Sequence, residues 1–363
     1  MILIDFAHLT KRCVFTSIAN AKAKKKNGKF ITSHYSGMLL HGIISSLLYV
    51  VKEFQKDYGD LVVCLEGKSW RKHIYPDYKA QRVKEKEASE VVWEEIYEYV
   101  NELSGALKDD FGVMVLEHPE AEGDDIIGTL ATHTREKTLI VSSDKDFFQL
   151  LKNPLVDMFD PIKKEFVPRL SLQEIDDALL SHIIRGDSSD NISNIVAKEK
   201  FSPEFLSYLQ SKEIFVTTPQ EFFKLSISDK LIQEYNVYET YQSGKNKGKE
   251  KDKKLIYNKT ILTRSRLRTL MEDIRNNREI GEWLQTQYNL NKTLIDLTCI
   301  PTRIKDEIIT LYANYTFKKP NAMNMLNFCL KHKLNNIVKQ LQYFHSRAKV
   351  KEVSLSDFWM IMI

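Results

Sequence analysis

The sequence is short of cysteine, glycine and long apolar runs, and each shortage excludes a class of protein. The four cysteines include no Cys-x-x-Cys pair, so their spacing fits neither a zinc site nor a disulfide framework, and we expect reduced thiols in a cytoplasmic protein. Nine prolines and 13 glycines among 363 residues exclude a collagen-like or linker-like chain. The longest apolar stretch, residues 38–51, is interrupted by polar and small residues. It is too short to span a bilayer, so we expect a buried helix and no membrane association.

Opposite charges almost cancel along the chain, with 53 Lys and Arg against 49 Asp and Glu, but they are segregated. Residues 68–86 hold basic side chains interleaved with Trp70, Tyr75 and Tyr78. This segment is either a solvated charged helix or a clamp for a nucleic acid strand, in which basic groups neutralise phosphates and rings stack on bases. A second basic run, residues 244–254, is of low complexity and predicts a solvated insertion.

The first half of the chain alternates apolar strands with helices. Strands are expected at residues 1–5, 60–65, 113–116 and 138–141, with helices at 36–58 and 124–133. This alternation predicts an α/β fold with a mostly parallel central sheet and helices on both faces. From residue 171 onward the pattern is mostly helical. We therefore expect an α/β domain over residues 1–180 and a helical C-terminal domain over residues 181–363.

Acidic residues follow four successive predicted strands. One acidic pair alone is usually a helix cap or a solvated turn, but the carboxyl ends of parallel strands meet at one edge of the sheet. Two carboxylates about 4 Å apart repel by roughly 4 kcal/mol at an effective dielectric of 20, so a gathered cluster needs cations. Oxygen ligands without His or Cys favour Mg²⁺ or Mn²⁺, and paired ions suit phosphodiester hydrolysis. The acids are Asp5, Glu66, Glu122, Asp124, Asp125, Asp144 and Asp146, with Asp187 and Asp190 in a later loop.

Five ordered motifs resemble those of the structure-specific 5′-nuclease (flap endonuclease) family, most closely the RNase H-type 5′→3′ exonucleases of T-even bacteriophages. They are LIDF around Asp5, WRKHIYPDYKAQR at 70–82, EGDD at 122–125, SSDKDFFQL at 142–150 and GDSSDN at 186–191. The resemblance implies a PIN-like nuclease domain with a helical arch at about residues 68–108. It also implies a helix–three-turn–helix element at 181–210 that grips duplex DNA.

The activity that this resemblance implies is Mg²⁺-dependent hydrolysis at the 5′ ends of RNA/DNA hybrids, duplex DNA and flap DNA. In this family such hydrolysis removes RNA primers during DNA replication. Two metal ions are implied, with Mn²⁺ able to substitute. The implied partners are a single-strand DNA-binding protein or a sliding clamp, the implied state is a monomer, and a viral origin would place it in a host cytoplasm.

The resemblance also assigns roles to individual residues. Tyr78, Lys79 and Arg82 are expected at the arch base, where the family holds the 5′ strand and the scissile phosphate. Asp125 is expected to assist one of the two ions. The first ion is assigned to Asp5, Glu66, Glu122, Asp124 and Asp144, and the second to Asp146, Asp187 and Asp190. Further nucleic-acid contacts are expected at Arg71 and Lys72 and, from charge alone, at Lys198 and Lys200.

Two positions depart from the family pattern. Glu66 stands where the family usually has Asp, which keeps the charge but lengthens the side chain by one methylene. The glycine-rich hairpin that usually follows Asn191 is missing, so its bound K⁺ is not implied here. These departures keep a second hypothesis open: a catalytically weakened, structure-specific DNA-binding protein of the same fold. A single-strand ribonuclease of the PIN type is a third hypothesis, which the basic segment and the long C-terminal half disfavour.

Overall fold

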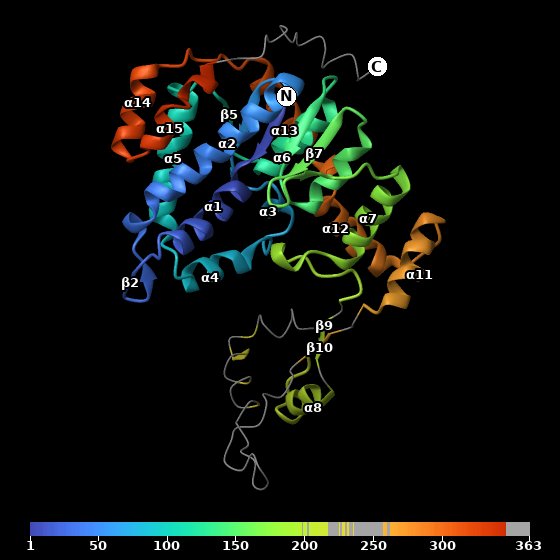
Figure 1. Cartoon of the computed structure of the whole chain (residues 1–363). Helices are drawn as coiled ribbons and strands as arrows, with labels where there is room; N and C mark the ends of the chain where they lie inside the picture. Colours follow the sequence, from blue (N-terminus) through green and yellow to red (C-terminus); the bar gives the residue numbers. More distant parts are fainter. Residues whose placement is uncertain are drawn as a thin grey trace. The chain divides into compact units, whose positions relative to one another are not determined.

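The computed structural model divides the chain into two compact units, each described here by itself (Figure 1). The first contains Met1–Ile183, Asp187–Ile192 and Asn289–Ile363, and the second contains Ile184–Gly186 and Ser193–Tyr288. The structure describes residues 1–197, 199–201, 203–216, 225, 227, 228, 231, 235, 257–259 and 262–345. Lys198 and the 244–254 insertion lie outside the described residues, as does the side chain of Lys200.

A six-stranded sheet forms the centre of the first unit. Its strand order is β5-β4-β1-β6-β7-β8, in which the first five strands are parallel and β8 is antiparallel to β7. The sequence predicts four of these strands and misses the last two. The strands are β1 (Ile2–Asp5), β4 (Leu61–Cys64), β5 (Met114–Leu116), β6 (Thr138–Val141), β7 (Val156–Asp160) and β8 (Glu165–Phe166). The mostly parallel sheet of the predicted α/β fold is therefore confirmed.

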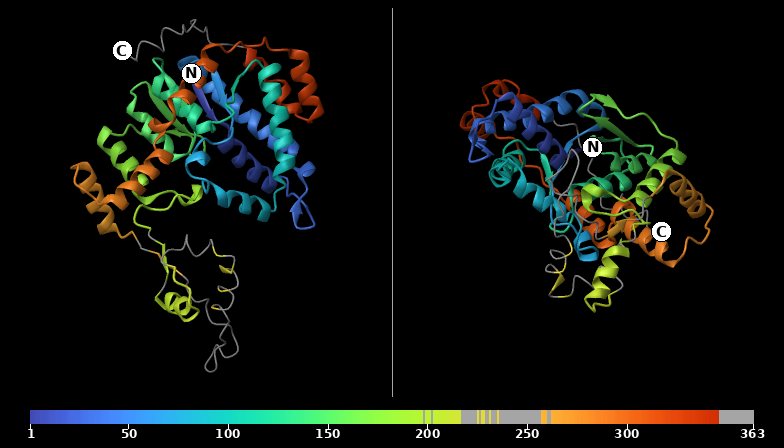
Figure 2. Two further views of the ribbon diagram at one scale, coloured as in Figure 1. Left: turned by 180° about the vertical axis from the view of Figure 1, so that it is seen from behind. Right: turned by 90° about the horizontal axis from the view of Figure 1, so that it is seen from below.

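Helices cover both faces of this sheet, because successive strand residues point to opposite sides. Ile2 and Ile4 join one apolar core, whereas Leu3 joins the other. The first core includes α1 (Phe6–Asn20), α2 (Ser36–Tyr58), α5 (Trp93–Asp109), α14 (Ala322–Lys331) and α15 (Asn335–Val338). The second includes α6 (Gly123–His133) and α13 (Thr302–Ala313). Figure 2 shows these two helical layers from two further directions.

Two features of these layers bear on the sequence-based expectations. Residues 289–345 pack with the sheet rather than with the second unit, because Ile304 and Ile308 of α13 complete the core against α6. The sequence grouped them with the C-terminal half because their pattern is helical. Among the described helices, α2 alone is long and apolar enough to cross a membrane. Most of its apolar side chains, including Leu40, Ile44 and Leu47, are buried in the first core.

Several short elements complete the first unit. The segment expected as an arch contains α3 (Arg71–Ile74), α4 (Ala80–Ala88) and α5. A small hairpin contacts the end of α4, where the Phe30 N–H donates to the Glu90 carbonyl oxygen at 2.8 Å. The other elements are β2 (Lys25–Lys26), β3 (Lys29–Phe30), η1 (Thr32–His34), η2 (Lys145–Lys152), η3 (Ser188–Asp190), η4 (Leu297–Cys299) and η5 (Leu341–His345).

The second unit has a small apolar core of its own, formed by Phe205, Leu209, Leu231 and Tyr235. An antiparallel strand pair accompanies it. Its described elements are β9 (Glu199–Phe201), α8 (Pro203–Ser211), β10 (Tyr257–Lys259) and α11 (Arg264–Arg275). Two helices, α7 (Leu172–Arg185) and α12 (Glu282–Ile295), run from one unit into the other. The expected helix–three-turn–helix region, 181–210, contains the end of α7, then η3, β9 and most of α8; its grip on duplex DNA stays a prediction.

Candidate metal centre

The carboxyl ends of β1, β4 and β6 bring the first acids together. Asp5 is the last residue of β1 and caps α1, accepting a hydrogen bond from the His8 N–H at 3.0 Å. The Ser142 hydroxyl, which follows β6, donates to Asp5 Oδ2 at 2.8 Å. Asp5 is only 6% exposed, but it lines a cavity of about 320 Å³ beside α1 and α2. The protein therefore fixes one side of this carboxylate by hydrogen bonds.

The N-terminus of α6 supplies three more acids beside the end of β4. Glu122 caps the helix and Asp125 completes a capping box, so each side chain accepts from the other's backbone N–H. Gly123 permits this approach, because a Cβ there would lie 3.3 Å from both the Cys64 carbonyl oxygen and Glu66 Oε1. The Gly123 N–H also hydrogen bonds to Glu66. Asp124 follows in the first turn of α6, where the charges of Asp5 and Glu66 act on its carboxylate.

Arg71 lies beneath this helix terminus and neutralises its buried acids. Its Nη2 atom is 2.8 Å from Asp125 Oδ1, and its Nη1 atom donates to Asp125 Oδ2 at 3.0 Å and Glu122 Oε2 at 3.2 Å. A third contact runs from Nε to the Leu294 carbonyl oxygen at 2.7 Å. Trp70 Nε1 donates to Asp125 as well, at 3.2 Å. Arg71 is 3% exposed and Asp125 is fully buried. This bidentate pair is a structural ion pair.

The start of α4 brings basic and phenolic groups onto the same acids. Lys79 has a left-handed backbone, with φ of 57°, and its N–H donates to the Asp190 carbonyl oxygen at 2.9 Å. Its Nζ atom contacts Glu122 and lies 3.7 Å from Asp190 Oδ2. The Tyr78 hydroxyl lies 2.9 Å from Glu122 Oε2 and from Asp190 Oδ2. Arg82 Nη2 donates to Asp190 Oδ1 at 2.5 Å.

These contacts divide the acids at the sheet edge into two groups. We call Glu122, Asp125 and Asp190 the paired cluster, because each has an Arg or Lys within 4 Å. Burial alone would raise the pKa of Glu122, but Lys79 and Arg71 hold that pKa below its usual value. The protein itself therefore supplies the positive charge that this group needs.

Four of the other acids have no Lys or Arg ion pair among the described residues. We call these four the open cluster: Asp5, Glu66, Asp124 and Asp144. Dehydration, followed by the charges of Glu122 and Asp5, raises the pKa of Glu66 to about 7. Burial, Asp5 and Glu66 raise the pKa of Asp124 well above its usual value. Burial and Asp146 raise the pKa of Asp144. The Lys79 ammonium group offsets the shifts of Glu66 and Asp124 only in part, so these carboxylates stay short of compensating positive charge.

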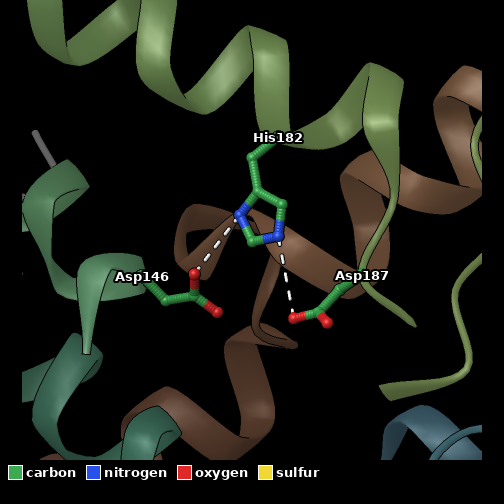
Figure 3. Close-up of side chains that lie close together, drawn as sticks. All are labelled: Asp146, His182 and Asp187. Atoms are coloured by element: carbon green, nitrogen blue, oxygen red, sulfur yellow. Dashed lines mark ion pairs between the residues drawn. The ribbon is translucent and has the colours of Figure 1, made fainter. Parts of the chain in front are cut away.

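A third group of titratable side chains is formed by Asp146, His182 and Asp187. Figure 3 shows His182 of α7 between Asp146 and Asp187, with one ring nitrogen toward each acid. Its Nδ1 atom is 3.2 Å from Asp146 Oδ1, and its Nε2 atom is 3.7 Å from Asp187 Oδ2. The hydrogen bond to Asp146 and the interaction with the Asp187 carboxylate raise the pKa of His182 to about 10, and the same imidazolium lowers the pKa of Asp187. We call these three residues the histidine cluster.

Most of the acids singled out from the sequence lie at one sheet edge, but their neighbours differ from the expected ones. Asp190 shares the contacts of Tyr78 and Lys79 with Glu122, whereas His182 lies between Asp146 and Asp187. The guanidinium of Arg71, which was expected to touch nucleic acid, is instead buried on Asp125, and its contact with nucleic acid stays an untested prediction. Lys72 is exposed, as that expectation requires. His182 was missed, because it contacts an acid 36 positions away and no local spacing marks it.

A family model for the N-terminal resolvase-like domain of 5′-3′ exonucleases matches residues 1–178. Residues 1–178 therefore form an N-terminal domain of the 5′-3′ exonuclease family. This domain contains the whole parallel sheet and seven of the nine acids proposed from the sequence. The relation to 5′-3′ exonucleases expected from the motifs is therefore confirmed for this domain, as is its α/β fold.

Individual relatives match over shorter stretches. Ribonuclease H of Enterobacteria phage T4 is 30% identical over 207 residues, which are 55% of this chain and 64% of that protein. Flap endonuclease Xni of Shewanella denitrificans is 40% identical over 121 residues, 32% of this chain and 44% of that protein. The matches thus span less than two thirds of either relative. A crystal structure of T5 D15 protein co-crystallized with metal ions aligns over 85% of this chain and 96% of that chain, with a TM-score of 0.47 and 14% identity.

Proposed function

We propose that this chain is a Mg²⁺-dependent 5′-nuclease that hydrolyses phosphodiesters at the 5′ ends of RNA/DNA hybrids, duplex DNA and flap DNA. The observation that carries the proposal is the open cluster, four acids without a protein cation, beside the Lys79 ammonium group. The 5′-3′ exonuclease domain at residues 1–178 supports it. So do the printed names of the relatives, one a ribonuclease H and another a flap endonuclease.

The open cluster has the donor set that a hard divalent ion takes. Its ligands are carboxylate oxygens, and the raised pKa values of Glu66, Asp124 and Asp144 mean that the protein alone poorly tolerates their charge. Asp5, Glu66, Asp124 and Asp144 would hold one ion, and the histidine cluster would hold a second. Bound Mg²⁺ would lower the pKa of an attacking water and offset charge on the phosphate. Asp125 would act as a positioning residue, because Arg71 occupies both of its oxygens.

The basic residues at the start of α4 would act on the substrate. Lys79 and Arg82 each pair with an acid of the paired cluster, and the side chain of Arg82 is 47% exposed. Their ammonium and guanidinium groups would orient the scissile phosphate and stabilise charge that develops on it. Tyr78, which is buried between Glu122 and Asp190, would keep those two acids in place rather than contact the strand.

The route of the substrate follows the exposed basic side chains. Lys72 and Arg82 lie on the segment proposed as the arch, and the phosphate contacts there would be electrostatic and independent of sequence. Removal of RNA primers during replication is the biological role that fits cleavage of a hybrid from its 5′ end. A single-strand DNA-binding protein, a sliding clamp, a monomeric state and a cytoplasmic location stay predictions from the family resemblance.

The test is a Mg²⁺ titration of cleavage on a 5′-labelled RNA/DNA hybrid and on a 5′ flap. We expect short 5′ products or excised flaps that disappear with EDTA and in Asp146→Asn. Glu98→Gln, which removes an exposed acid on α5, is the matched control and should cleave normally. Tight binding without cleavage in either Mg²⁺ or Mn²⁺ would refute the proposal. It would then favour the DNA-binding alternative, in which the longer Glu66 disables the site.

A further inference from the structure

We infer that His182 is a ligand of the second metal ion, through Nε2, and that Asp146 orients its ring. This inference rests on the proposed metal-dependent function and changes the expected ligand set, which contained oxygen atoms only. Three side chains carry it, each offering one ligand atom within 4.8 Å of the others: Asp146, His182 and Asp187. All three belong to the first unit and are partly buried, with side-chain exposures of 36%, 27% and 21% respectively.

The two distances on the imidazole ring differ in a way that assigns the nitrogens. The 3.2 Å between Nδ1 and Asp146 Oδ1 is a hydrogen-bond distance. The 3.7 Å between Nε2 and Asp187 Oδ2 is too long for one. Two atoms bound to one ion at about 2.1 Å lie roughly 3.0–4.2 Å apart, depending on the angle at the ion. The Nε2 and Asp187 atoms already have such a separation.

The remaining contact fits the same assignment. Metal-binding histidines almost always donate their other ring N–H to a carboxylate, a carbonyl or water, which fixes the tautomer and the ring plane. Asp146 is placed to accept that hydrogen bond from Nδ1. Its second carboxylate oxygen stays available toward the ion, directly or through water. The site would therefore combine one nitrogen with carboxylate oxygens.

A nitrogen ligand changes which ion the site prefers. Mg²⁺ binds oxygen ligands and keeps much of its water, whereas transition metals accept imidazole readily. The open cluster has no His ligand of this kind, since His8 Nδ1 is 3.8 Å from Asp5 Oδ2 and already 3.3 Å from the Ser142 hydroxyl. We therefore expect the histidine cluster to select Mn²⁺ over Mg²⁺ by at least about tenfold, and the open cluster to select between them weakly.

The experiment uses Mn²⁺ as the probe and the full chain without nucleic acid. Electron spin-echo spectroscopy of bound Mn²⁺ detects coupling to an imidazole ¹⁴N, and room-temperature EPR counts free Mn²⁺ in competition with Mg²⁺. The variants are His182→Asn, which offers an amide oxygen in place of the nitrogen, and Asp146→Asn, which removes the orienting acceptor. His34→Gln, an exposed histidine in η1, is the matched control.

We expect nitrogen coupling in the wild type and in His34→Gln, and its loss in His182→Asn. The tenfold preference for Mn²⁺ should disappear in His182→Asn while Mg²⁺ still binds, and Asp146→Asn should weaken Mn²⁺ by about 10–100-fold. Coupling that is absent from the wild type, or that survives in His182→Asn, would overturn the inference. Either result is independent of cleavage, so a wild type that cleaves in Mg²⁺ without nitrogen coupling would leave the proposed function intact.

Discussion

The open cluster and the paired cluster lie at the same sheet edge but have opposite electrostatic balance. In the paired cluster, Lys79 and Arg71 hold the pKa of Glu122 low, and Asp125 and Asp190 also have an Arg or Lys partner. In the open cluster, the pKa values of Glu66 and Asp124 are raised, so its acids repel one another. Counting acids would therefore overestimate the metal ligands. The acids that need a metal ion are those to which the protein offers no cation.

The two clusters should differ most in their effect on the cleavage rate, which should fall steeply when an acid of the open cluster is replaced. Asp124→Asn should slow cleavage in Mg²⁺ by roughly 10³-fold or more, because a bound metal supplies several kcal/mol of transition-state stabilisation. The same variant should fold at least as stably as the wild type without metal, because it removes a repelled charge. Single-turnover rates on the 5′ flap and thermal melting in EDTA check the two halves. Normal cleavage by Asp124→Asn would contradict the assignment of the metal to this cluster.

A smaller but still large catalytic effect is expected at the cations of the paired cluster. Replacing Lys79 and Arg82 together with Ala should lower the single-turnover rate by about 10²–10³-fold, since each would stabilise charge on the scissile phosphate. Duplex DNA binding should weaken far less. Lys84→Ala, an exposed cation on the same helix, is the control. An unchanged rate in the double variant would show that these cations serve only to neutralise Glu122 and Asp190.

Substitutions at the buried ion pair of the paired cluster should mainly change the free energy of unfolding. Arg71→Met leaves Asp125 buried and unpaired, so it should lower the free energy of unfolding by about 3–5 kcal/mol. Adding Asp125→Asn to Arg71→Met should recover part of that loss, because the unpaired charge is gone. Urea unfolding of the single and double variants measures both. A loss below about 1 kcal/mol for Arg71→Met would contradict the structural role and restore the nucleic-acid role that its sequence position suggested.

The sequence predicts the sheet and the acids well because both depend on local patterns. Apolar strands such as residues 61–64 are recognisable alone, and the topology rule then places the acids that follow them at one edge. What pairs with each acid depends on contacts between distant residues. Arg71 and Lys79 look alike in a basic segment, yet one is buried on Asp125 and the other reaches Glu122. His182 meets Asp146 only because α7 packs beside η2, so no motif could mark it.

The smallest expected effect is on how folding stability depends on pH, and it reports on Glu66 alone. Its pKa is about 7 in the folded protein against an ordinary value of 4.5, so the folded state holds a proton that the unfolded state has released. Folding stability should therefore fall as the pH rises from about 4.5 to 7, and the contribution is flat outside that window. Glu66→Gln, which cannot ionise, should remove this contribution.

Thermal melting in EDTA measures the effect as a difference between two proteins, which cancels the other titrating groups. At pH 7.5 Glu66→Gln should melt above the wild type by about 2 °C. The shift is modest because Glu66, although surrounded by protein atoms, keeps part of its surface in water, which screens its charge. Well below pH 4.5 the two should melt together, since Glu66 is then protonated in both states. Saturating Mg²⁺ should reverse the order at pH 7.5, because the ion stabilises only the carboxylate. A wild type that melts above Glu66→Gln without metal would place a protein cation on Glu66 and remove it from the open cluster.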